Sequence, residues 1–275
     1  MSGVRDQASG SVRIGGRVQS LVVALGAVLL VLFLVAPLAT LVGAGGAEGL
    51  AALFGDAELR ASLLLTAATA TAATFLGVLG GTPLAHLLAR RRFRGRALLA
   101  AVIDLPLLVP HPVAGIALLL VLGRDSAVGG ALLAAGVRLI GSPLGIVSAM
   151  LLVSAPIYVS AAREAFARVD PRYEYVARTL GDSPARVFRR VTLPLALRGL
   201  LSAGVVMWAR AVSEFGAIVV LTYNPKVASV LSYDRFTSAG LPGALPVAAV
   251  LVLLSLAPLT VLRALHAPHE TRLER

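Results

Sequence analysis

The sequence contains no cysteine, which excludes disulfide bonds, thiolate metal sites and cysteine nucleophiles. Lysine is nearly absent as well, because Lys226 is the only one and every other basic residue is arginine. A phosphate-binding loop of an ATPase ends in Gly-Lys-Ser or Gly-Lys-Thr, whereas Lys226 lies in the sequence Tyr-Asn-Pro-Lys. The chain therefore carries no ATPase site of this kind, and we expect a non-enzymatic protein with no cofactor or metal of its own.

Charged residues are scarce, at 14% of the 275 residues, whereas 57% of the residues are hydrophobic. The net charge of +11 would suggest nucleic-acid binding in a soluble protein. Here the arginines lie between apolar runs that reach the roughly 18 to 20 residues needed to cross a bilayer. This pattern favours a protein of the lipid bilayer that binds no nucleic acid.

The apolar runs predict an all-α polytopic membrane protein with six spans, at residues 21–42, 61–89, 97–122, 143–162, 195–222 and 241–262. We expect a single transmembrane domain over residues 20–265, with polar tails at 1–19 and 266–275. A cleavable signal is the alternative for the first run, because small residues follow it, but the run is long for a signal core. The second span has an Ala/Thr-rich face that suits close helix packing in lipid.

Prolines interrupt the third predicted span at Pro106, Pro110 and Pro112. Proline kinks or breaks a helix, and a membrane tolerates this where the freed backbone faces protein or water. We expect one bent helix. Asp104 and His111 in the same span leave a metal or proton site open, although no third ligand lies near them in the sequence.

The connections between the spans are short and differ in charge. An acidic loop with Glu48, Asp56 and Glu58 is expected after the first span, and the basic run 89–96 after the second. His86 beside that basic run is either an interfacial residue or a proton carrier. A surface helix at 131–137 and a polar loop at 223–240 complete the connections.

Arginine and lysine counts predict the orientation in the membrane. Nineteen of these residues fall in the N-terminal tail, in residues 90–96 and 163–198, and from Arg263 onward, against five on the opposite side. Basic residues concentrate on the cytoplasmic side. Both termini and residues 163–194 are therefore expected in the cytoplasm, on an inner (cytoplasmic) cell membrane.

The predicted cytoplasmic stretch from Asp170 to Pro194 is the longest polar interval in the chain. It reads as two short helices and a turn, and Glu174 and Arg178 form a favourable i,i+4 pair on the first. Gly181 is a suitable residue just after that helix, and Ser183-Pro184 a suitable start for the next. We expect the second helix to end at Leu193-Pro194. The first has a small apolar face consisting of Tyr173, Val176, Ala177 and Leu180.

This stretch resembles a motif in the membrane subunits of ATP-binding-cassette importers: Glu-Ala-Ala, three residues, Gly, nine residues, an aliphatic residue, one residue, Leu-Pro. The matching positions are Tyr175-Val176-Ala177, Gly181, Val191 and Leu193-Pro194. Tyr175 departs from the pattern, with Glu174 one position earlier. The resemblance implies a coupling helix that docks into a groove on a separate ATPase subunit.

Two longer segments narrow the resemblance. Residues 62–115 look like the molybdate, tungstate and sulfate permease group, apart from His111 between two prolines that are usually adjacent. Residues 209–241 are closer to the tungstate/molybdate branch. The resemblance implies a homodimer, two ABC ATPases that bind ATP with Mg²⁺, and an extracytoplasmic oxyanion-binding protein, with 123–141 and 223–240 as its docking surfaces.

Two charged residues, Arg210 and Glu214, lie in the middle of the fifth span, four residues apart and on one face. Each costs roughly 2.5 to 3.5 kcal/mol at a helix centre, so they should pair and face protein or water. They are either a structural ion pair or part of a path for a tetrahedral dianion. Ser213, Phe215 and Gly216 flank them, and Phe215 is either a constriction or core packing.

Two other function classes compete with an ABC permease. A secondary transporter or channel is expected to show internal repeats or discontinuous charged helices, and no convincing repeat is present. An intramembrane enzyme needs a nucleophile, metal ligands or paired acids, and Asp104, His111 and Glu214 form no recognisable set. Co-purification with an ATPase separates the first class from the others, and sulfate stays open as the substrate.

Overall fold

The computed structural model describes residues 6–266, which are mostly helical and contain no strand. The all-α prediction is confirmed. The long helices are α1 (Asp6–Gly55), α2 (Ala57–Arg90), α6 (Pro143–Ala167), α9 (Leu193–Val212) and α11 (Ala228–His266). The short ones are α3 (Arg96–Leu108), α4 (His111–Leu122), α5 (Ala127–Ala134), α7 (Pro171–Thr179), α8 (Pro184–Val187), the π-helical turn η1 (Phe188–Thr192) and α10 (Gly216–Leu221).

The core of the molecule is the packing of α2 against α6 and α9. Small residues on α2 allow this approach, as the sequence predicted. At Gly81, an added Cβ atom would lie 2.8 Å from Cδ1 of the buried Tyr158 on α6. Threonine hydroxyls on α2 bond back to their own helix, as Thr66 Oγ1 does to the Ser62 carbonyl at 2.6 Å. The packing face of α2 therefore consists of small residues, and its threonine hydroxyls have hydrogen-bond partners.

Among the described residues, five helices are long and apolar enough to cross a membrane, and α3 with α4 makes a sixth candidate bent by 113°. The expected single bent helix at 97–122 is thus wrong: it is two helices. Pro110 begins the second one, because the N–H groups of Val113 and Ala114 both bond to its carbonyl, at 2.9 and 3.1 Å. At 1.5 Å per residue, neither helix alone spans a bilayer.

The expected acidic loop after the first span is also wrong. Helix α1 continues to Gly55, so Glu48 is helical and Asp56 alone separates α1 from α2. The Asp56 carboxylate accepts the Leu59 N–H at 2.9 Å, which caps α2 and fixes this sharp corner. Away from this corner, α1 packs mainly on α11.

Two further connections differ from expectation. The surface helix is α5, which ends before Val137 because Gly136 has a left-handed backbone with φ of +82°. Most of the expected loop 223–240 is the first part of α11. Gly240, with φ of +70°, interrupts the helix where the sixth span was expected to begin.

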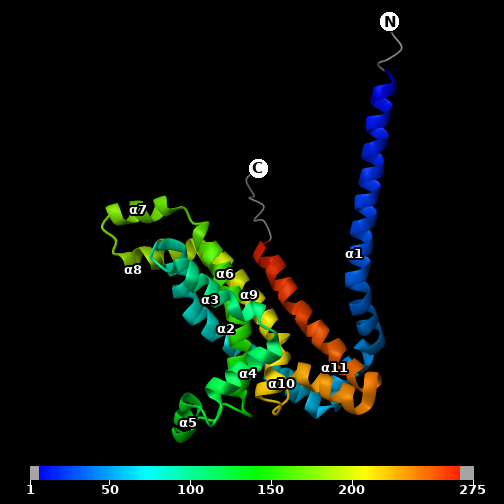
Figure 1. Cartoon of the computed structure of the whole chain (residues 1–275), viewed down its shortest axis with the longest axis vertical. Coiled ribbons are helices and arrows are strands. Elements are labelled where there is room, and N and C mark those ends of the chain that lie inside the picture. Colours follow the sequence, from blue (N-terminus) through cyan, green and yellow to red (C-terminus); the bar gives the residue numbers. More distant parts are fainter. Residues whose placement is uncertain (1–5, 267–275) are drawn as a thin grey trace, which may run out of the picture.

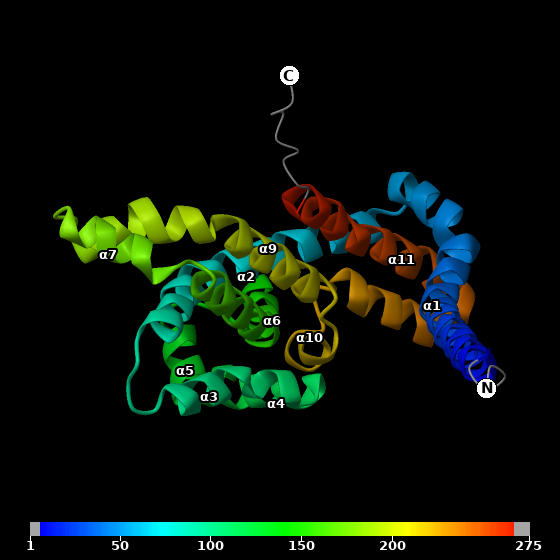
Figure 2. The same ribbon diagram turned by 90° about the horizontal axis from the view of Figure 1, so that it is seen from above.

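Elements divide clearly between the two ends of the molecule (Figure 1). Helices α7 and α8 lie at the same end as the N-terminal end of α1 and the C-terminal end of α11, whereas α5 and α10 lie at the other end. Figure 2, seen from above, shows α1 and α11 to one side of the α2, α6 and α9 core. We call these two ends the α7 end and the α5 end. The arrangement agrees with an even number of crossings, and the cytoplasmic orientation stays a prediction.

Candidate functional site

The hairpin of α7 and α8 forms as the sequence predicted around Gly181. The Asp170 carboxylate caps α7 by accepting the Arg172 N–H at 2.9 Å. At the other end, the Gly181 N–H bonds to the Arg178 carbonyl and the Asp182 N–H to the Ala177 carbonyl, at 3.0 and 3.1 Å. These are the two bonds of a Schellman motif, which needs a left-handed residue, and Gly181 has φ of +93°.

The apolar face of α7 is mostly turned to the outside. Leu180 is 81% exposed, and Val176 and Tyr173 are each more than half exposed. Tyr175, where the importer pattern has glutamate, is exposed as well, whereas Ala177 is buried against the rest of the chain. Large apolar side chains on a short polar helix indicate a surface that another protein covers.

Glu174 was expected on the solvated face of α7, paired with Arg178. The solvated position is wrong, because Glu174 is only 6% exposed, whereas the ion pair with Arg178 is present. Arg178 Nη2 lies 3.8 Å away, while Arg90 Nε lies 2.9 Å from Glu174 Oε1 and the Thr192 hydroxyl donates to the same oxygen at 3.0 Å. Arg90 and Thr192 are far away in the sequence, so a helical pattern could not reveal these contacts.

The second helix of the hairpin was expected to end at Leu193-Pro194, and this is wrong. Helix α8 continues through η1 into α9, so residues 184–212 form one helical segment. The Leu193 N–H bonds to the Phe188 carbonyl, five residues back. Proline lacks an N–H and its ring crowds the preceding turn. A wider π turn makes room for Pro194, and the helix continues.

The charged pair of the fifth span lies at a break in that span. Helix α9 ends at Val212 and α10 begins at Gly216, so the expected continuous span 195–222 is wrong. Glu214 is fully buried, and its Oε2 accepts Arg210 Nη2 at 2.8 Å. Its Oε1 accepts the Ala217 N–H at 2.8 Å, so the carboxylate caps α10.

His111 joins this pair from the start of α4. Its Nδ1 lies 3.1 Å from Glu214 Oε2, and Arg210 Nη2 lies within 2.9 Å of both ring nitrogens. An added Cβ at Gly216 would lie 2.8 Å from the Cβ of His111, so glycine permits the contact of α10 with α4. The breaks in the third and fifth spans therefore meet at one polar cluster, which we call the Arg210 cluster.

The flanking candidates have local partners. The Ser213 hydroxyl donates to the Arg210 carbonyl at 3.0 Å and accepts from Arg210 Nη1 at 3.3 Å. Phe215 packs on Tyr233, with ring centroids 5.1 Å apart. Phe215 thus takes part in core packing within this chain.

The candidates for a metal or proton site are dispersed. Asp104 accepts a hydrogen bond from the Ser160 hydroxyl at 3.0 Å, whereas His111 contacts the Arg210 cluster. His86 lies between the rings of Phe166 and Phe188, with centroids 5.2 and 4.8 Å away. Within residues 6–266, no three His, Asp or Glu side chains come together as metal ligands would.

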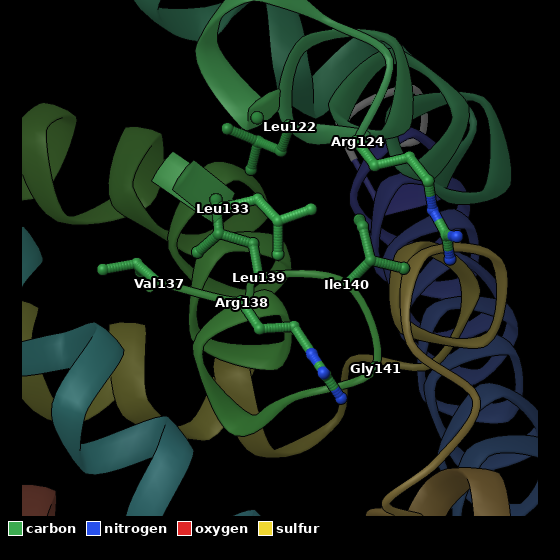
Figure 3. A pocket seen from close by; sticks show the side chains of 9 residues that line it. Leu122, Arg124, Leu133, Val137, Arg138, Leu139, Ile140 and Gly141 are labelled. Atoms are coloured by element: carbon green, nitrogen blue, oxygen red, sulfur yellow. The ribbon is translucent and has the colours of Figure 1, made fainter. Parts of the chain in front are cut away.

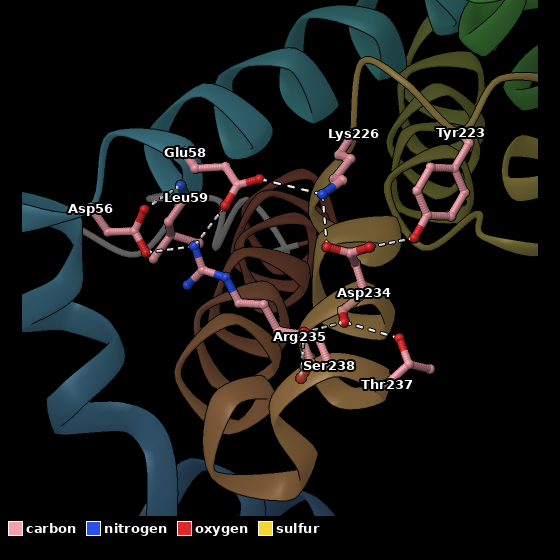
Figure 4. A network of polar contacts seen from close by, with 9 residues as sticks. All are labelled: Asp56, Glu58, Leu59, Tyr223, Lys226, Asp234, Arg235, Thr237 and Ser238. Carbon is pink, nitrogen blue, oxygen red and sulfur yellow. Dashed lines mark hydrogen bonds and ion pairs between the residues drawn. The ribbon is translucent and has the colours of Figure 1, made fainter.

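A network of ion pairs at the α5 end was not foreseen from the sequence (Figure 4). Arg235 on α11 pairs with Asp56 at 2.7 Å and Glu58 at 3.1 Å. Lys226 pairs with Asp234 at 2.7 Å and lies 3.5 Å from Glu58, and the Tyr223 hydroxyl donates to Asp234. The network joins the corner between α1 and α2 to the first part of α11.

The same network shifts the ionisation of its members outside the spans. The hydrogen bond to Asp234 raises the pKa of Lys226 and likewise that of Tyr223. Burial acts to raise the pKa of Asp56, but the Leu59 N–H and Arg235 outweigh it, so this pKa lies below its ordinary value. All three shifts stabilise the ionisation states that hold the corner together near neutral pH.

A hollow of ≈ 360 Å³ lies at the α5 end, between the end of α4, α5 and the loop to α6. Figure 3 shows Arg124 and Arg138 extending from its wall in the same general direction. Both side chains are exposed. The hollow thus presents positive charge at the end opposite the hairpin.

Comparison with curated proteins gives relatives in oxyanion transport. The chain is 49% identical over 119 residues to the "Molybdate/tungstate transport system permease protein WtpB" of Pyrococcus furiosus, covering 43% of this chain and 48% of the relative. It is 37% identical over 123 residues to the "Molybdenum transport system permease protein ModB" of Escherichia coli K12, covering 44% and 54%. A "Sulfate transport system permease protein CysT" of Synechococcus elongatus is 31% identical over 134 residues, covering 47% and 48%. The chain spans about half the length of the curated relatives it matches.

Solved structures with a similar fold come from ABC transporters. A chain of a bacterial ABC transporter involved in the import of the acidic polysaccharide alginate aligns with a TM-score of 0.69 and 16% identity, over 94% of this chain and 96% of that chain. A chain of the MetNI methionine ABC transporter in an inward-facing conformation aligns with a TM-score of 0.58 and 18% identity, over 75% and 95%. At these identities the likeness concerns the fold alone.

A family model described as the inner membrane component of binding-protein-dependent transport systems matches residues 77–275, which is most of the chain and includes the hairpin, the Arg210 cluster and the hollow at the α5 end. The chain therefore belongs to the family of inner membrane components of binding-protein-dependent transport systems.

Proposed function

We propose that this protein is the permease subunit of an ATP-driven importer for a tetrahedral oxyanion, with tungstate or molybdate as the substrate. The observation that carries the proposal is the α7 hairpin, which exposes Tyr173, Tyr175, Val176 and Leu180 at the end where both described termini lie. The names of the WtpB and ModB relatives support the choice of substrate. Sulfate is the second candidate, because the CysT relative is named for it.

The proposal requires partners that supply free energy and substrate. Two ATPase subunits bind ATP with Mg²⁺, and each receives one α7 hairpin in a groove. A binding protein delivers the oxyanion at the α5 end, where Arg124, Arg138 and residues 236–239 of α11 are exposed. Closure of the ATPase dimer moves the hairpins and opens the path outward, and hydrolysis resets the path inward.

A homodimer is the assembly that we propose. The apolar stretch of α1 supports this proposal, since its large side chains from Leu21 to Leu38 are all more than half exposed within one chain. Helix α1 packs mainly on α11 and does not cover the core formed by α2, α6 and α9. Lipid and a second copy of the chain together cover such surface in a bilayer.

The Arg210 cluster is the proposed polar point on the transport path. Glu214 is fully buried, whereas the Arg210 side chain is 21% exposed and so retains access from outside the cluster. With Glu214 and His111 holding it, the guanidinium presents positive charge at membrane depth. Preorganised positive charge favours a dianion without a large rearrangement.

The test is oxyanion uptake into vesicles that contain the permease with its ATPase and binding protein. We expect uptake that needs ATP, is inhibited by vanadate, and is reduced more by competing tungstate or molybdate than by sulfate. Full uptake by the permease alone would contradict the proposal and support a secondary transporter. Stronger competition by sulfate would indicate that sulfate is the substrate and would leave the proposed class of ATP-driven importer unchanged.

A further inference from the structure

A buried ion pair joins the α7 hairpin to the end of α2. Arg90 is the last residue of α2, and its Nε lies 2.9 Å from Glu174 Oε1. Its Nη2 also donates to the Val169 carbonyl at 2.7 Å, just before α7 begins. One guanidinium thus holds both the entry to the hairpin and the middle of its first helix.

The same carboxylate also reaches the end of the hairpin. The Thr192 hydroxyl, on the last residue of η1, donates to Glu174 Oε1 at 3.0 Å. Thr192 is 1% exposed and directly precedes α9. Glu174 therefore connects the hairpin to two spans, α2 through Arg90 and α9 through Thr192. We call Arg90, Glu174 and Thr192 the hairpin clamp.

An aromatic cluster reinforces the clamp on the same face of α2. His86 precedes Arg90 by four residues and so lies one turn away on that face. Its ring meets Phe166 of α6 and Phe188 of η1 edge-on, at 5.2 and 4.8 Å between centroids. The base of the hairpin is thus fixed by both apolar and ionic contacts.

Burial distinguishes the clamp from the other ion pairs at the α7 end. The side chains of Arg90 and Glu174 are 13% and 8% exposed, whereas those of Glu164 and Arg168 are 67% and 83% exposed. An exposed pair contributes little to stability. Removing one partner of a buried pair leaves an uncompensated charge, while removing both avoids that penalty.

We propose that Glu174 is a positioning residue that makes the hairpin, α2 and α9 move as one body, so that motion of the ATPase reaches both spans. This inference rests on the proposed function. It also accounts for the departure at Tyr175: the carboxylate at position 174 faces the clamp, and the exposed tyrosine faces the ATPase. The hairpin then acts as a rigid lever instead of a loose tether.

The rigidity is measured first, in the permease alone. Since the chain has no cysteine, Arg92→Cys and Thr179→Cys introduce the only two sites for spin labels, on the loop after α2 and on α7. We expect a narrow distribution of label distances, which broadens in Glu174→Gln and in Arg90→Gln. The Arg90→Gln/Glu174→Gln double variant has neither charge of the buried pair, so its distance distribution should be narrower than that of either single variant. Equal widths in all four proteins would overturn the clamp.

Transmission is measured next, in vesicles with the ATPase and binding protein, as ATP hydrolysed per oxyanion imported. Glu174→Gln should still co-purify with the ATPase but raise this ratio about threefold or more, the scale expected when a coupling network is perturbed. In the double variant, this ratio should lie between that of Glu174→Gln and that of the wild type. Glu164→Gln, the same change at an exposed acid of α6, is the control and should leave the ratio unchanged.

The outcomes separate the two proposals. A wild-type permease that binds no ATPase overturns the proposed function and the transmission role together. A wild-type permease that couples normally, with an unchanged ratio in Glu174→Gln, overturns the transmission role alone. A raised ratio that the Glu164→Gln control shares in full would also overturn it, because the effect would then not be specific to the clamp.

Discussion

At the scale of single residues, one glycine fixes the shape of the surface proposed to meet the ATPase. Gly181 holds φ of +93°, and no neighbour lies within 4 Å of the position where a Cβ would be. A side chain there meets backbone strain and no collision. The conformation itself costs an L-residue roughly 1–2 kcal/mol. Gly181 is thus a point where the hairpin can be perturbed without disturbing the spans.

Gly181→Arg should detach or uncouple the ATPase while the spans stay folded, because the strain and the bulk fall on the exposed turn. Co-purification of the ATPase and thermal unfolding of the permease measure the two effects. Gly95→Arg is the matched control, since Gly95 has φ of +88° and open space around it, but lies in the loop after α2. Survival of ATPase binding and transport in Gly181→Arg would contradict the role of the hairpin.

Arg210 tests the transport path. Arg210→Ala should lower oxyanion uptake while co-purification with the ATPase persists, because the guanidinium lies on the proposed path and far in the fold from the α7 hairpin. Arg210→Lys keeps a charge near Glu214 and should retain more uptake than alanine does. Uptake equal to wild type in Arg210→Ala would show that the pair is structural only.

At the scale of helices, close approach of α2 to α6 depends on small side chains. Gly81→Val should lower the free energy of unfolding by about 1–3 kcal/mol, the usual range for overpacking a core, because its first added atom would meet the Tyr158 ring. Thermal unfolding in detergent measures this. The neighbouring Gly80→Val is the control, since no atom lies within 4 Å of its Cβ position. Equal stability of the two variants would refute the tight contact.

The ion-pair network at the α5 end predicts a dependence of stability on pH. The pKa of Asp56 lies below its ordinary value of 3.8, so its contribution is present above that value and is lost as the pH falls through the lowered pKa. The pKa of Lys226 is raised above 10.5, so its contribution is fully present below that value and is lost only at higher pH. Near neutral pH both contributions are complete.

We therefore expect the unfolding temperature to be flat near neutrality and to fall below about pH 4. In Asp56→Asn the fall should be smaller, because the variant has no charge to lose at this position. Thermal unfolding across an acid series measures the difference. Parallel curves for wild type and Asp56→Asn would show that the network contributes nothing to this dependence.

At the scale of the whole molecule, the described chain leaves large apolar surface outside its own core, most of all along α1. A bilayer covers such surface, and so does a second copy. Two differently tagged copies should therefore co-purify from membranes in mild detergent, together with the ATPase. The two copies are expressed in the same cells, and extracts of two singly tagged strains mixed after solubilisation are the control. Recovery of one tag without the other from the co-expressing cells would favour a monomer.

Periodicity and hydropathy alone predicted the all-α class, the second and fourth spans, and the turn at Gly181. These features depend on neighbours within about one or two helical turns, and the spacing of side chains along a helix is fixed by its geometry. The spacing from Tyr175 to Pro194 is local in the same sense. The motif that resembles those of ABC importer subunits can therefore be recognised in the sequence alone.

Only the tertiary structure decided how the interrupted segments meet. The sequence shows that Pro110 disturbs a helix, but the contact of His111 with Arg210 and Glu214 depends on how α4 and α10 pack. Likewise the sequence shows the pair of Glu174 with Arg178, but the burial of Glu174 against Arg90 of α2 depends on how the hairpin packs on that helix. Ion pairs between distant segments depend on which faces pack together, and the pattern of a single helix does not contain that information.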